Sequence, residues 1–372
     1  MGRRIREFPR RENLRYIRAR IPTMARGHQT GLARIRTIRC HATSDDIASV
    51  SLDELDLPDP GPGEVQVRTK ACAVNYPDLM MIQGTHQHRP PLPFAPGGEG
   101  AGEVAAVGAG VSHFREGDAV CFGRLSGGFA EALNVPAAAV DPMPANMTYA
   151  KAASYRTAYT TAYVALVVRG ALQPGEWLLV HGATGGVGLA AVELGKHYGA
   201  KVIGTGGRDD KLAVVKARGA DAVINYSLPD GSLGGFRHKV KEITGTDGAD
   251  VIYDPVGGDV FDESMRCINW CGRILSIGFV SGRWPAAAVN LVLIKSISVI
   301  GVRAGEIGRR DPALGSQIRA AVADLAHGGA IDPYVCAGFP LERAVDAMRM
   351  LENRSVVGKC VVTMNGYEFE GA

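Results

Sequence analysis

The pattern of apolar and polar residues changes near residue 147. Before it, Val65, Val67 and Thr69 alternate with polar neighbours, which is typical of a strand with one buried face. Short apolar runs broken by glycine follow at 103–108 and 118–123. This first part of the chain therefore predicts a compact, mostly antiparallel β-barrel.

After residue 147, a helical segment covers 150–168, and apolar runs of strand length then alternate with segments of helical period. The strand-like runs lie at 178–181, 201–205, 222–224, 250–253, 273–277 and 297–301. This alternation predicts a parallel, doubly wound sheet. The last part of the chain predicts helices at 313–327 and 341–352 and a strand at 359–362.

The predicted fold class is therefore α/β, with a Rossmann-type doubly wound parallel sheet and a second, mostly antiparallel barrel domain. The chain has 372 residues, which is enough for two domains. We expect a leader at 1–30, the barrel domain at 31–157, the Rossmann domain at 158–299 and a return to the barrel domain at 300–372. No apolar stretch reaches the roughly 18 residues of a membrane span.

The turn after the first parallel strand is rich in glycine and leads into a helix. Gly185 lets the backbone approach a pyrophosphate, Gly188 lets the helix pack on the strand, and the helix N-terminus offers unpaired N–H groups to the anion. A second strand at 201–205 completes a βαβ unit, which strengthens a motif that is a weak signal alone. The residues predicted to cradle a dinucleotide pyrophosphate are Ala183, Thr184, Gly185, Gly186, Val187 and Gly188.

The end of the second strand favours NADPH over NADH. An NAD site usually has an acidic residue there, whereas this chain has Gly206 and Arg208, with Lys211 one helical turn later. Asp209 and Asp210 stand where a helix N-terminus prefers acidic residues. We therefore predict that Gly206, Arg208 and Lys211 surround the 2′-phosphate of NADPH. The alternative is that the two cations are solvated surface residues.

The formal net charge of +3 hides a strong asymmetry, because residues 1–30 contain nine arginines and only two glutamates. The remainder carries 32 cationic against 36 anionic side chains, which argues against nucleic acid as a partner of the folded body. The leader is open to three interpretations: a transit peptide for mitochondrial import, a nucleic-acid arm, or a translated segment ahead of a later start. We favour the last and expect disorder over 1–30.

The seven cysteines are scattered and odd in number, which fits a reducing compartment such as the cytoplasm. Cys267 and Cys271 are spaced to share a helix face, but no second Cys or His pair follows at zinc-site spacing. We therefore assign this pair to core packing and expect no metal site.

Three motifs occur in a fixed order: VNYPDLMMIQG at 74–84, PGGEGAG at 96–102 and the glycine-rich turn at 183–188. Together they resemble the medium-chain dehydrogenase/reductase superfamily, and within it the zinc-independent, NADPH-dependent quinone oxidoreductase group related to zeta-crystallin. The resemblance covers residues 40–363. It implies a GroES-like barrel domain beside the Rossmann domain.

The chain departs from the zinc alcohol dehydrogenases of that superfamily. Those enzymes hold the catalytic zinc through a cysteine where this chain has Asn75 and a histidine where it has Gly98. Only Cys121 lies in the region that would carry the structural-zinc cysteines. Oxidation of a plain alcohol is hard to support without a Lewis acid, whereas reduction of a quinone or conjugated carbonyl can use the cofactor's hydride alone.

The resemblance also implies roles for individual residues. Asn75 and Thr161 would lie beside the nicotinamide ring. His86 stands where relatives commonly have a tyrosine, and it could donate a proton to the reduced substrate. Each of these residues also has a structural alternative. Asn75 could be a turn residue, Thr161 could be a helix hydroxyl bonded to the backbone, and His86 could be a solvated loop histidine. Further cofactor contacts implied by the resemblance are Tyr226, Val256, Gly278, Phe279 and Arg354.

The predicted function is NADPH-dependent reduction of quinones or related conjugated carbonyl compounds. Two alternatives are open: an enoyl thioester reductase, which shares the machinery, and a nucleotide- or RNA-binding, crystallin-like protein with incidental activity. We expect a small-molecule substrate and no membrane partner. As in relatives, the strand at 297–301 could pair with its twin across a homodimer.

Overall fold

A six-stranded parallel sheet forms where the sequence predicts alternating strands and helices. In the computed structural model, which describes residues 34–371, the strands run in the order β10-β9-β8-β11-β12-β13, the doubly wound order of a Rossmann domain. Their bounds are β8 (Trp177–Val180), β9 (Lys201–Gly206), β10 (Ala222–Asn225), β11 (Ala249–Asp254), β12 (Ile268–Ser276) and β13 (Ser298–Gly301). The domain boundary predicted at residue 300 falls inside β13. The arginine-rich leader, with its predicted disorder, lies outside the described residues.

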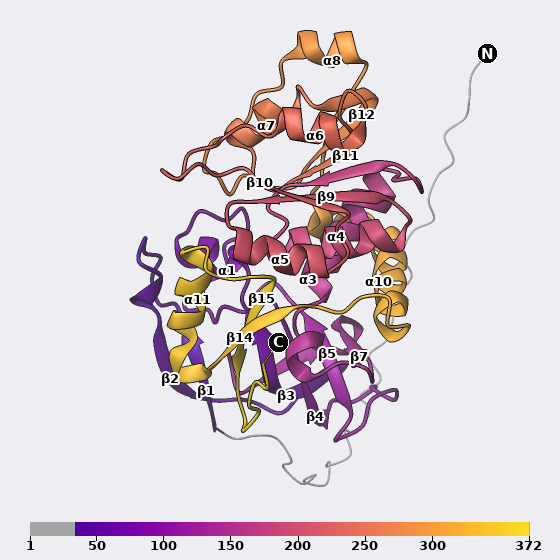
Figure 1. Cartoon of the computed structure of the whole chain (residues 1–372). Helices are drawn as coiled ribbons and strands as arrows, with labels where there is room; N and C mark the ends of the chain where they lie inside the picture. The colour runs from indigo at the N-terminus through magenta and orange to yellow at the C-terminus, as the bar shows by residue number, and fades with distance from the viewer. Residues whose placement is uncertain (1–33, 372) are drawn as a thin grey trace, which may run out of the picture.

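Helices cover both faces of this sheet (Figure 1). They are α3 (Arg156–Tyr163), α4 (Gly186–His197), α5 (Asp209–Ala217), α6 (Arg237–Thr244), α7 (Gly258–Ser264), α8 (Val289–Lys295), α9 (Ala304–Arg310) and α10 (Pro312–His327). Leu178 and Val180 pack with α3, α4 and α10, whereas Leu179 packs with α6 and α7 on the other face. Burial on both faces explains why these strands read as continuous apolar runs.

A seven-stranded sheet forms the barrel domain, in the order β14-β15-β3-β4-β5-β7, with β6 paired to β3. Its strands are β3 (Glu64–Ala73), β4 (Glu99–Val107), β5 (Ala119–Gly123), β6 (Ala132–Pro136), β7 (Val140–Pro142), β14 (Val335–Pro340) and β15 (Lys359–Thr363). Every pair except β14–β15 is antiparallel, so the predicted barrel is confirmed. The chain thus returns to this domain after the parallel sheet. A separate pair, β1 (Arg34–Arg39) and β2 (Ser51–Asp56), completes the described strands.

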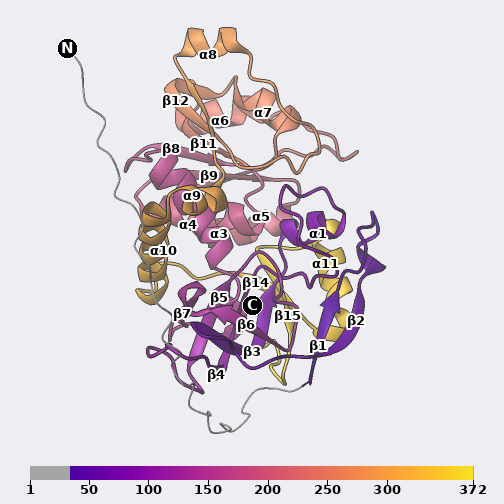
Figure 2. The ribbon, with the colours of Figure 1, turned by 180° about the vertical axis from the view of Figure 1, so that it is seen from behind.

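Two shorter helices, α1 (Tyr76–Ile82) and α11 (Ala344–Glu352), lie beside the barrel (Figure 2). The remaining helical elements are α2 (Tyr149–Ala152), η1 (Ile47–Ser49), η2 (Ala137–Ala139), η4 (Leu341–Arg343) and the π-helix η3 (Val164–Arg169), which packs against α3 and α4. The helical segment predicted over 150–168 is present, divided into α2, α3 and the π-helix η3. The predicted shared helix face of Cys267 and Cys271 is wrong. Cys267 is buried just before β12, while Cys271 is exposed within that strand at φ +58°.

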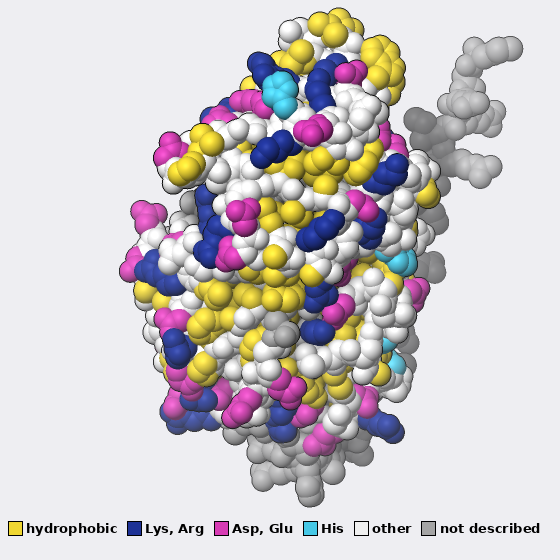
Figure 3. All heavy atoms as spheres, viewed as in Figure 1, with side chains coloured by type: hydrophobic (Ala, Val, Ile, Leu, Met, Phe, Trp, Pro, Cys, Tyr) yellow, Lys and Arg dark blue, Asp and Glu magenta, His cyan; other side chains and the backbone are white. Residues whose placement is uncertain are grey.

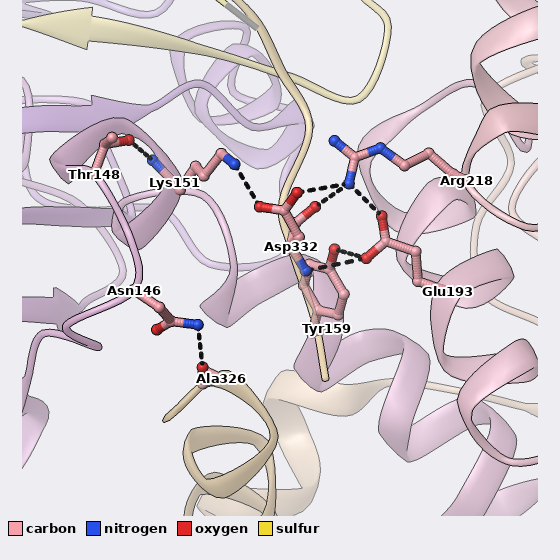
Figure 4. Close-up of polar contacts among 8 residues, drawn as sticks. All are labelled: Asn146, Thr148, Lys151, Tyr159, Glu193, Arg218, Ala326 and Asp332. Carbon is pink, nitrogen blue, oxygen red and sulfur yellow. Dashed lines mark hydrogen bonds and ion pairs between the residues drawn. The ribbon is translucent and has the colours of Figure 1, made fainter. Parts of the chain in front are cut away.

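A polar cluster fixes the barrel domain to α4 and α5 (Figure 4). Arg218 pairs with Glu193 at 3.3 Å and with Asp332 at 3.0 Å, and Lys151 of α2 approaches Asp332 to 2.5 Å. The Tyr159 hydroxyl donates to Glu193 at 2.6 Å. Burial raises the pKa of the Glu193 carboxyl, whereas the hydrogen bond from Tyr159 and the charge of Arg218 favour its ionised form. The cluster links α2, α3, α4 and the segment before β14 into one unit.

Candidate active site

The glycine-rich turn has the close approaches that a dinucleotide cradle requires. A Cβ atom on Gly188 would lie 2.2 Å from the Gly182 carbonyl oxygen, so only glycine lets α4 pack this tightly on β8. Gly185 is the N-cap of α4, and its nearest neighbour to a Cβ would be that same oxygen at 3.5 Å. The free N–H groups at the start of α4 therefore suit the pyrophosphate of a dinucleotide.

The barrel domain holds this turn from the other side. The Gly358 N–H donates to the Thr184 carbonyl at 2.8 Å, and Gly185 and Gly358 form a parallel β-bridge. A Cβ on Gly186 would lie 2.6 Å from Cδ of Lys359, so the lysine stem rests directly against the turn. The predicted pyrophosphate cradle is thus built by both domains.

Lys359 ends in a buried polar network with two motif residues of the barrel. Its Nζ lies 2.5 Å from Oδ1 of Asn75 and 3.0 Å from Oε1 of Glu99. The Asn75 Nδ2 donates to the same Glu99 oxygen at 3.1 Å. Glu99 and Lys359 are 1% and 6% exposed, so the pair is a buried ion pair whose remaining bonding capacity is filled by polar partners. The network fixes the orientation of the Asn75 amide.

The second carboxylate oxygen of Glu99 reaches α3. Oε2 accepts from the Thr157 N–H at 2.8 Å, which places negative charge at the N-terminus of that helix. One turn later, the Thr161 hydroxyl donates to the Thr157 carbonyl at 2.7 Å. Its one proton is therefore used within the helix, as in the alternative interpretation, while its oxygen can still accept a hydrogen bond. Asn75 and Thr161 thus belong to elements joined through Glu99.

His86 lies apart from this network, in the loop after α1. Its N–H bonds to the Met80 carbonyl at 3.1 Å, and its Nδ1 lies 3.1 Å from the His88 carbonyl and 3.2 Å from the His88 nitrogen. Among residues 34–371, no hydrogen-bond partner is found for its Nε2. That nitrogen is the one available to a ligand.

The end of β9 differs from the prediction in one respect. Lys211 is 7% exposed and donates to the carbonyls of Arg354 at 2.6 Å and Val356 at 3.2 Å. A solvated surface cation is therefore wrong for Lys211, and burial lowers the pKa of its ammonium. Arg208 is exposed and pairs with Asp210 at 2.6 Å. The Tyr226 N–H donates to the Gly206 carbonyl at 3.1 Å.

The contacts around Lys211 bring the predicted cofactor residues of both domains together. The Arg354 backbone accepts from Lys211, and its guanidinium donates to the Val280 carbonyl at 3.0 Å, next to Phe279. Arg354 itself has φ +54°. The arginine therefore joins the ends of β9 and β12 to the barrel domain.

The turn after β11 is shaped by a buried carboxylate. Oδ1 of Asp254 accepts from the N–H groups of Val256 at 2.8 Å and Gly257 at 2.9 Å. Burial raises the pKa of this carboxyl to about 6. A Cβ on Gly278 would lie 3.3 Å from the Pro255 carbonyl, so the turns after β11 and β12 lie against each other. Val256, Gly278 and Phe279 therefore share the carboxyl edge of the sheet, where such folds bind ligands.

Glu99 and Lys359 are site residues that the sequence-based site prediction missed. Lys359 opens a fully buried strand and is followed by three apolar residues, and a buried lysine needs an anionic or hydrogen-bonding partner. Glu99 lies in an otherwise uncharged, glycine-rich motif. The sequence around each residue therefore indicates an unusual environment. It does not indicate that Glu99 and Lys359 pair with each other. Over the described part of the chain, no group of three or more His, Cys, Asp or Glu side chains could hold a metal ion.

Comparisons with known proteins agree with this architecture. The sequence profile of the "Alcohol dehydrogenase GroES-like domain" matches residues 61–145, and that of the "Zinc-binding dehydrogenase" matches residues 186–326. The quinone oxidoreductase-like protein 2 homolog of Nematostella vectensis is 36% identical over 338 residues, covering 90% of each chain.

Two solved structures extend the comparison. A probable oxidoreductase from Mycobacterium abscessus has a TM-score of 0.79 and 32% identity over 90% of this chain and 100% of its own. Escherichia coli quinone oxidoreductase complexed with NADPH has a TM-score of 0.75 and 30% identity over 88% of this chain and 99% of its own. The prediction of NADPH as cofactor agrees with that complex.

A Rossmann domain inserted between the two parts of a GroES-like barrel defines an oxidoreductase of the medium-chain dehydrogenase/reductase superfamily. Within that superfamily, the chain belongs to the quinone oxidoreductase group. The predicted family is confirmed.

Proposed function

We propose that this protein reduces quinones or related conjugated carbonyl compounds with NADPH and without zinc. The observation that carries the proposal is the buried network of Asn75, Glu99 and Lys359 beside the glycine-rich turn. Asn75 stands where the zinc enzymes have a ligand, and its amide is bonded to an ammonium group. An acceptor that is already electrophilic needs no Lewis acid to take a hydride.

Bound NADPH would supply the hydride. The chain's own residues would position the acceptor and the ring: Lys359 and Glu99 hold the Asn75 amide, and Glu99 also fixes the first turn of the helix that carries Thr161. His86 would deliver the proton through Nε2, since its Nδ1 is engaged by the His88 backbone. Water is the alternative proton source.

We assign the adenosine end of NADPH to residues from both domains. Arg208, which is exposed, would pair with the 2′-phosphate, and Arg354 would approach it from the barrel side. Lys211 would act mainly by holding the backbone at residues 354–356. Tyr226 would lie beside the adenosine, next to Gly206.

The test is an acceptor panel with both nicotinamide cofactors. Purified protein should oxidise NADPH with at least one simple quinone or enone, and kcat/KM should be lower with NADH. Failure with every acceptor of both classes would refute the proposed function. A clear preference for NADH would refute the cofactor assignment alone.

We also propose a homodimer, formed through β13 and α8. In residues 34–371, the outer edge of β13 has no strand partner, and nearby apolar side chains are exposed. Figure 3 shows apolar side chains gathered over α8, and the exposed residues near this edge are Trp284, Val289, Leu293, Ile294 and Val299. Pairing two copies would extend the sheet and cover this surface.

We propose the cytoplasm as the compartment. All seven cysteines are free thiols, as expected for a reducing environment. No described helix is long and apolar enough to cross a membrane. Subcellular fractionation of tagged full-length protein tests this assignment against mitochondrial import.

A further inference from the structure

A histidine that has no role in the reaction proposed above is buried at the end of β8. His181 directly follows Val180, the last residue of the strand, and only Gly182 separates it from the glycine-rich turn at 183–188. Its side chain is fully buried. A buried imidazole needs hydrogen-bond partners for both ring nitrogens, because an unpaired polar group away from water is costly. Both partners of this ring come from other elements of the Rossmann domain.

One ring nitrogen contacts β9 and the other contacts α7. The Nδ1 atom lies 2.8 Å from Oγ1 of Thr205, the residue before Gly206 at the end of β9. The Nε2 atom lies 2.8 Å from Oγ of Ser264, the last residue of α7. Both hydroxyl groups belong to buried residues. The imidazole therefore fixes the start of the glycine-rich turn to two elements that follow it much later in the chain.

The direction of these hydrogen bonds follows from the hydroxyl protons. Ser264 donates its one proton to the Val260 carbonyl at 2.7 Å, so its oxygen accepts from the Nε2–H group of His181. Burial lowers the pKa of His181 to about 3, so the ring is neutral near pH 7 and its Nδ1 has no proton. Nδ1 therefore accepts from the Thr205 hydroxyl, whose other acceptor, the Val180 carbonyl, is farther away at 3.4 Å. One tautomer satisfies both nitrogens.

Thr205 connects this ring to two parts of the cofactor site. Its carbonyl accepts from the Ala183 N–H at 3.0 Å, inside the pyrophosphate cradle. Gly206 and Arg208 follow it, where we assign the 2′-phosphate. The distance between the cradle and Arg208 thus depends on how Thr205 is held. His181 is the side chain that holds its hydroxyl.

The ring also packs toward the place that we assign to the adenosine. Its centroid lies 4.9 Å from that of Phe236, and the Phe236 ring lies 6.1 Å from that of Tyr226. The Tyr226 N–H donates to the Gly206 carbonyl, so these aromatic contacts lead back to the end of β9. A hydrogen bond and aromatic packing therefore both connect His181 to this strand end.

We propose that His181 is a positioning residue, which sets the distance between the pyrophosphate cradle and Arg208 and so determines how strongly the protein prefers NADP⁺ to NAD⁺. This inference rests on the cofactor assignment in the proposed function and is independent of the acceptor. Because it is fully buried, His181 acts through Thr205 and does not touch the cofactor. Only a dinucleotide with a 2′-phosphate binds at both ends of this distance, so a change in the distance should weaken NADP⁺ binding more than NAD⁺ binding.

Calorimetric titration with NADP⁺ and NAD⁺ tests the proposal without turnover. His181→Leu removes both bonds, but the hydroxyl groups of Ser264 and Thr205 keep backbone carbonyls as acceptors, so we expect this variant to fold. Thr205→Val removes one bond with almost no change in shape. Both variants should lower the preference, which is the dissociation constant of NAD⁺ divided by that of NADP⁺, about tenfold. Thr69→Val is the matched control, because Thr69 is equally buried but lies in β3 of the barrel.

Two outcomes of this titration are distinguishable. A preference that is unchanged in both His181→Leu and Thr205→Val would overturn the proposal, as would an equal loss of preference in Thr69→Val. Wild-type protein that binds NAD⁺ as tightly as NADP⁺ would overturn the cofactor assignment as well, because there would be no 2′-phosphate contact to position.

The Arg208→Gln background shows whether His181 acts through the 2′-phosphate contact. With that guanidinium removed, Thr205→Val should change the preference less than about twofold, since little is left to position. A further tenfold fall in this background would overturn the positioning role.

Nitrogen NMR of protein with isotope-labelled histidine gives a readout of the hydrogen bonds themselves. The signal that is lost in His181→Leu should show the Nε2–H tautomer and should not titrate between about pH 5 and pH 9. Titration within this range, or the Nδ1–H tautomer, would overturn the arrangement on which the proposal rests.

Discussion

Lys359 donates a hydrogen bond of 2.5 Å to Oδ1 of Asn75, a residue 284 positions earlier in the chain. The same ammonium pairs with Glu99, and its stem lies against Gly186 of the dinucleotide turn. One side chain therefore connects the barrel motif residues to the cofactor-binding turn. Burial makes this arrangement costly to break, because each charge depends on the other.

Replacing Lys359 tests this dependence. Lys359→Met should lower the free energy of unfolding by about 3–5 kcal/mol, since it leaves the Glu99 carboxylate buried and unpaired. The double variant Lys359→Met/Glu99→Gln should recover part of the loss, because the charge is then removed. Urea unfolding of Lys359→Met, of Glu99→Gln and of the double variant measures the coupling energy between the two side chains. Arg343→Met, which breaks an exposed pair, should have little effect. Additive losses in the double variant would show that the pair is not coupled.

Arg208 should determine the cofactor preference. Arg208→Gln is expected to raise the KM for NADPH about tenfold while leaving the KM for NADH nearly unchanged, because only NADPH has the 2′-phosphate. Asp210→Asn is the matched comparison, since it removes the partner that competes with the phosphate and should not weaken NADPH binding. Steady-state kinetics with both cofactors measures the difference. Equal effects of Arg208→Gln on the two KM values would exclude contact with the phosphate.

The buried carboxyl of Asp254 should make stability depend on pH. Burial raises its pKa in the folded protein to about 6 from an ordinary 3.8. The contribution of this carboxyl to the free energy of unfolding is therefore fully present below about pH 4 and is lost as pH rises through about 6. Two pKa units correspond to about 3 kcal/mol. Asp254→Asn keeps an Oδ1 acceptor for both backbone N–H groups. It should therefore gain about 2–3 kcal/mol relative to wild type between pH 4 and pH 7.5.

Denaturant unfolding across this pH range gives the comparison. Asp230→Asn is the control, because hydrogen bonds from Ser232 lower the pKa of that exposed carboxyl and its dependence should have the opposite sign. A pH-independent difference between Asp254→Asn and wild type would contradict the role of burial.

The exposed apolar surface at α8 should be covered in solution. Wild-type protein is expected to sediment as a dimer, and Leu293→Asp should shift it toward monomer, because the charge would be buried in the interface. Leu228→Asp replaces another exposed leucine outside α8 and should leave the dimer intact. Analytical ultracentrifugation over a concentration series decides the point. A dimer that persists in Leu293→Asp would exclude this interface.

Much of the parallel sheet could be predicted because its strands are buried on both faces. Leu178, Leu179 and Val180 read as one apolar run, since alternate residues meet different helix layers. The glycine-rich turn could be predicted equally well, because Gly188 is required by its close contact with the neighbouring residue Gly182. By contrast, β14 contains Gly338 and Pro340 and lies at a sheet edge, so its pattern is weak.

The site network could not be derived from sequence in the same way. Lys359 is 260 residues from Glu99 and 284 from Asn75, and no local pattern links positions so far apart. Lys211 illustrates the same difficulty. Its spacing predicts a phosphate contact, but its ammonium is turned toward carbonyls of the returning chain at 354 and 356. Such pairings depend on tertiary structure.

The central claim is hydride transfer from NADPH to a conjugated acceptor, and isotope labelling tests it most directly. Protein treated with a chelator would be given NADPH deuterated at nicotinamide C4 and a conjugated enone, and the product would be examined by mass spectrometry and NMR. The account predicts one deuterium at the β-carbon of the saturated product, from one of the two C4 positions. A product without deuterium, or turnover that requires added zinc, would contradict it.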